Sequence, residues 1–121
     1  MKWLNKTSDS NCIVTFYESN ITLNTEATHR FRQAYRVMIG LNTDDNVIAF
    51  KPLSKEEVEK YSISDDQTYK ISIGSSYSRI SNKKIIKEIA KQINIEFSET
   101  NKNFKFFGKW NDSEKYLEIT Y

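Results

Sequence analysis

The side chains best suited to chemistry in this sequence are cations near the start of a predicted helix. Residues 70–109 hold nine basic and three acidic side chains, whereas residues 1–60 hold eight of each. The cations nearest this helix start are Arg79, Lys83, Lys84, Lys87 and Lys91. Cations on one face at the start of a helix could contact the phosphates of a nucleic acid. A lysine-rich helix face could equally serve only to keep a protein in solution.

A second group of cations lies in the first half of the chain, on another predicted helix, and consists of Arg30, Arg32 and Arg36. Arginine is better suited than lysine to bidentate contacts with guanine or phosphate. Three arginines on a helix are also common as surface ion-pair partners. A DNA-binding hypothesis would use both groups.

Aromatic residues cluster between residues 104 and 116, with Lys105 and Lys109 among them. Aromatic rings interleaved with lysines could stack on the bases of a single strand. Strand alternation would place Phe104, Phe106 and Trp110 on one face, provided that no bulge occurs at Gly108. Burial of that face in the core is the favoured interpretation.

Enzymatic and metal chemistry find little support in the sequence. Cys12 is the only cysteine and His29 the only histidine, so neither an intramolecular disulfide nor a cysteine-based metal cluster can form. The pairs Asp44–Asp45 and Asp65–Asp66 are explained by turn chemistry. We therefore predict a non-enzymatic protein with no cofactor, no metal and no catalytic residue.

The chain has 121 residues, the size of a single domain, and 38% of them are hydrophobic. No apolar run approaches the roughly 20 residues needed to span a bilayer. The first residues lack the apolar core of a signal peptide. A cytoplasmic protein without a membrane partner is expected. Residues 1–11 would form either an arm that docks through Trp3 or an edge strand.

The first half, residues 12–52, predicts a strand, a short strand, a helix and a hairpin. The β-branched run Cys12–Tyr17 and the alternating Ile21–Leu23 favour strands. Asn24 is placed to cap a helix from Thr25 to about Tyr35. The hairpin would comprise 37–41, a turn cluster at 42–46, and 47–50, with Pro52 ending the second strand.

The connector, residues 53–68, contains a predicted short helix capped by Ser54 and Glu57. The second half, residues 69–121, again predicts strands, a helix and a hairpin. Ser81 or Asn82 would cap the helix, whose buried stripe is Ile86, Ile89, Ala90 and Ile93. The predicted strands are 69–73, a short strand around 79–80, 104–110 and 116–121.

These two halves match element for element, with little sequence identity. The short strand and helix match at an offset of 59 residues, and the hairpins at 69, so the second copy has about ten extra residues before its hairpin. We predict an α+β fold with a small barrel-like β core, built from two pseudo-symmetric strand–helix–hairpin halves that pack together.

This order resembles the swapped-hairpin families AbrB, SpoVT and MraZ. The resemblance rests on residues 20–24 (Asn-Ile-Thr-Leu-Asn) and 49–52 (Ala-Phe-Lys-Pro), which look like the two ends of one such unit. It implies a barrel-like β core with helices at its side, and DNA binding from basic residues near the strand–helix junctions. The proline usual after the first strand is replaced here by Asn24. The Asp-x-x-x-Arg pattern of MraZ and the Gly-Asp before the hairpin are absent.

The sequence therefore leads to two hypotheses. The first is a small DNA-binding transcriptional regulator that contacts the phosphates of double-stranded DNA through the basic helix start. The second is a non-catalytic protein-interaction or oligomerisation module, including a homo-oligomer, that uses exposed strand edges.

Overall fold

The computed structural model describes residues 11–121, so the predicted role of Trp3 lies outside the described residues. Eight strands form one antiparallel sheet in the order β3-β4-β8-β7-β1-β2-β6-β5. Their bounds are β1 Cys12–Tyr17, β2 Ile21–Leu23, β3 Arg36–Asn42, β4 Val47–Leu53, β5 Ser72–Ile73, β6 Ser78–Ile80, β7 Asn103–Asn111 and β8 Tyr116–Thr120. The helices are α1 Thr25–His29, α2 Lys55–Lys60 and α3 Lys83–Ile93, with a 3₁₀ turn, η2, at Asp65–Gln67.

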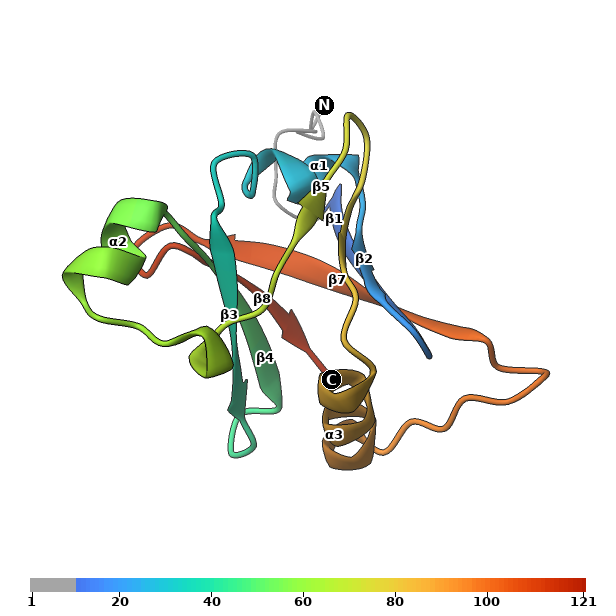
Figure 1. The fold of residues 1–121 in the computed structure, drawn as a ribbon. Coiled ribbons are helices and arrows are strands. Elements are labelled where there is room, and N and C mark those ends of the chain that lie inside the picture. Colours follow the sequence, from blue (N-terminus) through green and yellow to red (C-terminus); the bar gives the residue numbers. More distant parts are fainter. Residues whose placement is uncertain (1–10) are drawn as a thin grey trace, which may run out of the picture.

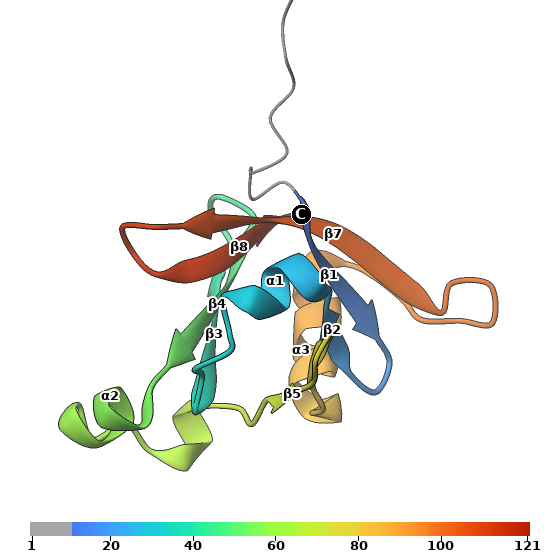
Figure 2. The same cartoon turned by 90° about the horizontal axis from the view of Figure 1, so that it is seen from above.

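The sheet curls around two of the helices. Figure 1 shows α1 at one end of the curled sheet and α3 at the other, and Figure 2, turned by 90°, shows both helices inside the arc of strands. The buried interior is formed by inward side chains of the strands, such as Val14, Phe16 and Phe50, with Ile86 and Ile89 of α3. The predicted α+β class with a curled, barrel-like β core is confirmed.

The segment from Tyr69 to Ile73 brings the two ends of the sheet together. At one end Tyr69 forms a β-bridge with Val37 of β3. At the other end Ser72 and Ile73 pair with β6. The strand predicted at 69–73 is regular only at Ser72–Ile73, because the two ends of the segment pair with different neighbours. One extended segment thereby spans the opening between β3 and β6.

Both predicted asparagine caps are present. The Asn24 Oδ1 atom accepts a hydrogen bond from the Ala27 backbone N–H at 3.1 Å, and the Asn82 Oδ1 atom accepts one from Ile85 at 3.0 Å. Ser54 and Glu57 form the predicted capping box of α2. These caps depend only on residues close in sequence, which is why the sequence predicts them well.

The first helix is shorter than predicted, because α1 ends at His29 instead of near Tyr35. The following turns tighten to i→i+3 hydrogen bonds, with Phe31 N–H donating to Thr28 and Ala34 N–H donating to Phe31. Tyr35 N–H then donates to Leu53 of β4. The chain therefore leaves the helix early to begin the β3–β4 hairpin.

Pro52 does not end β4, as predicted, but lies inside it opposite Val37. Val37 directs its own N–H and C=O to Tyr69, on the side away from β4. Val37 and Pro52 are therefore a non-hydrogen-bonded pair of the hairpin, in which the nitrogen of Pro52 points away from β3. The pairing of β4 with β8 ends at Phe50, so no ladder hydrogen bond is lost at the proline.

The predicted alternation along β7 is confirmed. Phe104 and Phe106 are half-buried and Trp110 is buried, whereas Lys105, Phe107 and Lys109 are exposed. The pairing of β7 with β1 and β8 continues through Gly108 without an extra residue, so the strand has no bulge there. The inward aromatic rings belong to the core: Phe106, for example, packs edge-on against Phe16 with ring centroids 5.6 Å apart.

Candidate nucleic-acid interface

Helix α3 presents its lysines to solvent, as predicted. Its inner side buries Ile86 and Ile89, and Asn94, with a left-handed φ of 60°, ends it. The four exposed lysines of the helix are Lys83, Lys84, Lys87 and Lys91. Within residues 11–121 none of these four side chains makes a hydrogen bond or an ion pair. Their charges are therefore available to an external anion.

The first turn of α3 has an unusual charge for a helix start. Lys83 and Lys84 occupy it, and the turn contains no acidic residue. The helix dipole places partial positive charge at this end, so cations here are unfavourable by about 0.3–1 kcal/mol each at low ionic strength. By contrast, the first turn of α2 carries Glu56 and Glu57. An anion bound at the start of α3 would relieve this repulsion.

Acidic groups lie on one side of the α3 start. A shallow cleft of about 300 Å³ lies between η2 and α3, and its lining includes Asp65, Asp66, Lys84 and Glu88. Burial, and then the charge of Glu88, raises the pKa of Tyr69, which lines the same cleft. The basic surface of α3 is thus bounded by an acidic margin on its η2 side.

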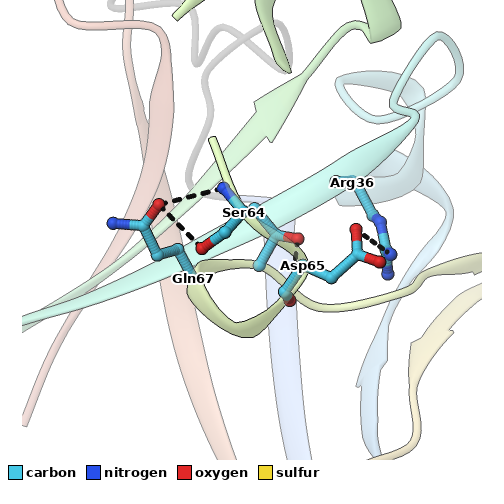
Figure 3. A network of polar contacts seen from close by, with 5 residues as sticks. Arg36, Ser64, Asp65 and Gln67 are labelled. Carbon is cyan, nitrogen blue, oxygen red and sulfur yellow. Dashed lines mark hydrogen bonds and ion pairs between the residues drawn. The ribbon is translucent and has the colours of Figure 1, made fainter. Parts of the chain in front are cut away.

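Arg36 is held within the protein. Its guanidinium Nη2 donates to the Asp65 carboxylate at 2.8 Å, and its side chain is only 12% exposed. Figure 3 shows this ion pair beside the contacts that shape η2, in which Ser64 donates to Gln67 Oε1 from its backbone N–H (3.0 Å) and from its hydroxyl (3.2 Å). Arg36 therefore fastens the connector to β3.

Arg32 and Arg30 also have partners within the protein. The Arg32 guanidinium donates to the backbone carbonyls of Gly74 and Ser75 in the β5–β6 loop. The Arg30 guanidinium lies 5.1 Å from the centre of the Trp110 ring, at a cation–π distance. Both contacts join segments distant in sequence. All three predicted arginines of the first half thus have structural contacts.

The Arg30 neighbourhood also includes Asp112. The hydrogen bond and charge of Lys115, at 3.0 Å, hold the pKa of Asp112 below its ordinary value, and the Trp110 indole and Arg30 add smaller effects. The Trp110 indole N–H is buried and makes no hydrogen bond of full geometry, although it lies close enough to Asp112 to influence it. This cluster lies at the turn between β7 and β8.

The structure brings the two predicted groups of cations only partly together. Arg36 lines a hollow of about 320 Å³ that also reaches Asn82, the cap of α3. Arg30 and Arg32 belong to the α1 segment, whereas the lysines lie on α3 at the opposite end of the curled sheet (Figure 1). Arg79 is exposed in the middle of β6, which leads directly into α3. The candidate interface therefore consists of the α3 lysines with Arg79 nearby.

Among the exposed aromatic residues, Phe107 belongs to the predicted aromatic cluster of residues 104–116, whereas Tyr77 was not predicted as a candidate. Phe107 is 75% exposed and Tyr77 57% exposed, and Tyr77 lines a hollow of about 430 Å³ together with Arg79. The alternation of buried and exposed positions along β7 separates Phe107 from its buried neighbours, and this alternation predicts its exposure from the sequence. The position of Tyr77 depends on the β5–β6 loop, in which the sequence has no periodic pattern.

In comparisons with known proteins, no family model, no curated protein and no solved structure matches the chain. Two further findings concern the described residues 11–121. None of their helices has the length and apolar character needed to cross a membrane. No three His, Cys, Asp or Glu side chains among them gather in a way that could hold a metal ion.

Proposed function

We propose that this protein is a small DNA-binding regulator that contacts the phosphates of double-stranded DNA through the lysine face of α3. The observation that carries the proposal is the pair Lys83 and Lys84 in the first helical turn. These cations oppose the helix dipole and have no partner within residues 11–121. A local arrangement that costs stability without compensation is expected mainly at functional sites.

A helix start of this kind suits phosphate for two reasons. The first backbone N–H groups of a helix lack intrahelical partners and point toward an incoming anion. The lysines at positions 84, 87 and 91 recur at i, i+3 and i+7 and therefore form one stripe along the helix. Phosphate contacts of this type give affinity and orientation, whereas sequence specificity would require contacts to base edges.

The proposal is tested by measuring binding of a fluorescent duplex as a function of salt concentration. Four lysine–phosphate contacts predict a slope of log K against log salt of about −3.6. Lys83→Glu should weaken binding and reduce the steepness of the slope by about one. The same substitution should stabilise the fold by about 0.6–2 kcal/mol, because it removes an unfavourable cation from the start of the helix and places an anion there.

Lys55→Glu is the matched control. Lys55 is the first residue of α2, as Lys83 is of α3, and both are exposed. The two variants change the net charge equally, but α2 lies well away from α3 (Figure 2). Equal loss of duplex binding in both variants, or no salt-sensitive binding by the unaltered protein, would contradict the proposal.

A second candidate function is protein interaction through a strand edge. Val37 directs its hydrogen-bonding groups to Tyr69, and those of Ile39 and Leu41 point the same way by alternation. Among residues 11–121 no strand pairs with β3 on that side beyond the Val37 bridge. An extended peptide, or a second copy of the chain, could add a strand there. Sedimentation analysis over a range of concentrations would detect self-association.

We also propose that the two halves of the chain are pseudo-symmetric copies. In support, β2 pairs with β6 and β4 pairs with β8, so equivalent strands are neighbours. The two hairpin turns are alike at the offset of 69 residues. Asn42 accepts from the N–H of Asp45 as Asn111 does from that of Glu114, and residues 46 and 115 have φ values of 56° and 60°.

A further inference from the structure

The most exposed large hydrophobic side chain among residues 11–121 is Phe107, in the middle of β7. The strand has no bulge, and the adjacent Gly108 faces inward, where a Cβ atom would approach Leu117 Cδ1 to 3.0 Å. The register is therefore locked, and Phe107 must point outward. An exposed aromatic ring offers a flat apolar face to a ligand.

Ile13 of β1 lies directly beside this ring. It is the cross-strand partner of Phe107, and it directs its own C=O and N–H toward Asn24, away from β7. The two residues thus form a non-hydrogen-bonded pair, in which side chains lie closest together. Ile13 is therefore the direct cross-strand neighbour of Phe107, whose side chain remains 75% exposed.

Cations flank the ring on the same face. Lys105 and Lys109 lie two residues on either side of Phe107, and both are exposed. Lys109 is opposite Glu118 of β8, so its charge is partly balanced, whereas Lys105 is opposite Thr15 of β1. The ring is therefore bordered by positive charge, mainly on the Lys105 side.

The same outward face continues across the sheet to a second aromatic residue. The cross-strand row runs from Lys105 through Thr15 and Thr22 to Arg79, a separation of three inter-strand steps or about 14 Å along the sheet. Within this row Thr15 is only 6% exposed, so the exposed groups lie toward its two ends. Tyr77 lies two residues from Arg79 and borders the hollow of about 430 Å³ on β6. Each end of the row thus combines an exposed aromatic ring with a cation.

We propose that this outward face of β7, β1, β2 and β6 binds single-stranded nucleic acid. Bases stack on Phe107 and Tyr77, and Lys105 and Arg79 contact the phosphates between them. Sheet faces that combine exposed aromatic rings with lysine and arginine are suited to unpaired bases, whose rings are accessible for stacking. This inference does not rest on duplex binding by α3, because it concerns a different form of nucleic acid and shares only Arg79 with the α3 interface.

Charge complementarity favours this occupant over a second copy of the chain. A two-fold contact through Phe107 would use the same patch on both copies. It would bring Lys105 and Lys109 of one copy close to those of the other. A polyanion neutralises these charges instead. An apolar peptide would cover Phe107 but leave Lys105 and Arg79 without partners.

The test uses the full chain with fluorescent oligothymidylate and oligouridylate, measured by anisotropy beside the labelled duplex. Phe107→Ala should weaken binding of the single strands roughly 5- to 150-fold, the range expected for loss of one stacked base. Phe107→Trp should retain binding, and its indole fluorescence should be quenched when a base stacks on it. Duplex binding should be unchanged by Phe107→Ala and weakened by Lys83→Glu.

Leu41→Ala is the matched control, because Leu41 is also an exposed apolar residue of a strand, on β3. Equal affinity for the oligothymidylate in the Phe107→Ala and unaltered proteins would overturn the proposal. So would self-association that Phe107→Ala abolishes while single-strand binding is absent, since the face would then belong to a second copy. Tighter binding of oligothymidylate would identify the ligand as single-stranded DNA, and tighter binding of oligouridylate would identify it as single-stranded RNA.

Discussion

Val37 and Tyr69 exchange two backbone hydrogen bonds, at 2.9 Å from the Val37 N–H and 2.8 Å from the Tyr69 N–H. Val37 is completely buried, and Tyr69 belongs to the connector between η2 and β5. This exchange links the two edges of the curled sheet. Its importance can be measured because one of the donors can be removed by proline.

Tyr69→Pro is expected to destabilise the fold more than Tyr69→Ala. Both variants lose the ring, but only the proline removes the N–H and leaves the buried Val37 carbonyl unpaired, at a cost of about 1–3 kcal/mol. Thr68 is extended (φ −134°, ψ 166°), as a residue before proline requires. Urea denaturation gives the two free energies of unfolding. Equal values would show that the bridge contributes nothing.

Gly108→Ala is expected to destabilise the protein by about 1–3 kcal/mol, the usual effect of overpacking a core. The added methyl group would meet Leu117 at 3.0 Å and Cys12 Cβ at 3.4 Å. Gly40→Ala is the control, because Gly40 is exposed on β3 and nothing lies within 4 Å of an added Cβ. Thermal unfolding of both variants should separate them, and an unchanged midpoint for Gly108→Ala would refute the close contact.

Asn24→Ala is expected to cost more than Asn82→Ala. Both lose a helix cap, worth about 0.5–2 kcal/mol. The Asn24 side-chain oxygen Oδ1 also accepts from the Ile13 N–H at 3.0 Å, and its side-chain Nδ2 donates to the Asn11 backbone carbonyl at 2.8 Å. Asn24→Asp should recover part of the loss by keeping the acceptor. Chemical denaturation provides the comparison, and equal losses would mean that the link to β1 is without energetic effect.

The raised pKa of Tyr69 predicts a loss of stability in alkali. Burial and Glu88 disfavour the phenolate in the folded state, so the folded pKa lies above the ordinary value of 10.0. The unfolded chain then binds fewer protons, and the stabilisation present below pH 10 decreases as the pH rises above it. Tyr69→Phe should reduce this decrease, measured as unfolding free energy below and above pH 10. An unaltered pH dependence would rule out Tyr69 as a source.

Features that depend on neighbouring residues could be predicted from the sequence. The caps at Asn24 and Asn82, the capping box of Ser54, and the alternation that separates Phe106 from Phe107 each follow from side-chain type and spacing over a few residues. The exposed lysine stripe of α3 follows in the same way from the helical period. These features have physical causes within a single element.

The tertiary structure decided the features that require distant partners. Only the fold shows that Arg32 donates to the carbonyls of Gly74 and Ser75 and that Arg36 pairs with Asp65, so that both arginines have partners within the protein. Only the fold shows that Pro52 occupies a position in β4 at which its nitrogen points away from β3, so that no hydrogen bond between the strands is lost. The burial of side chains, the pairing of strands and the neutralisation of charges depend on which segments lie next to one another in the fold. Hydrophobic periodicity does not specify which segments become neighbours. The sequence by itself determined the elements and their faces, and the three-dimensional pairing decided which charges and rings remain available for binding.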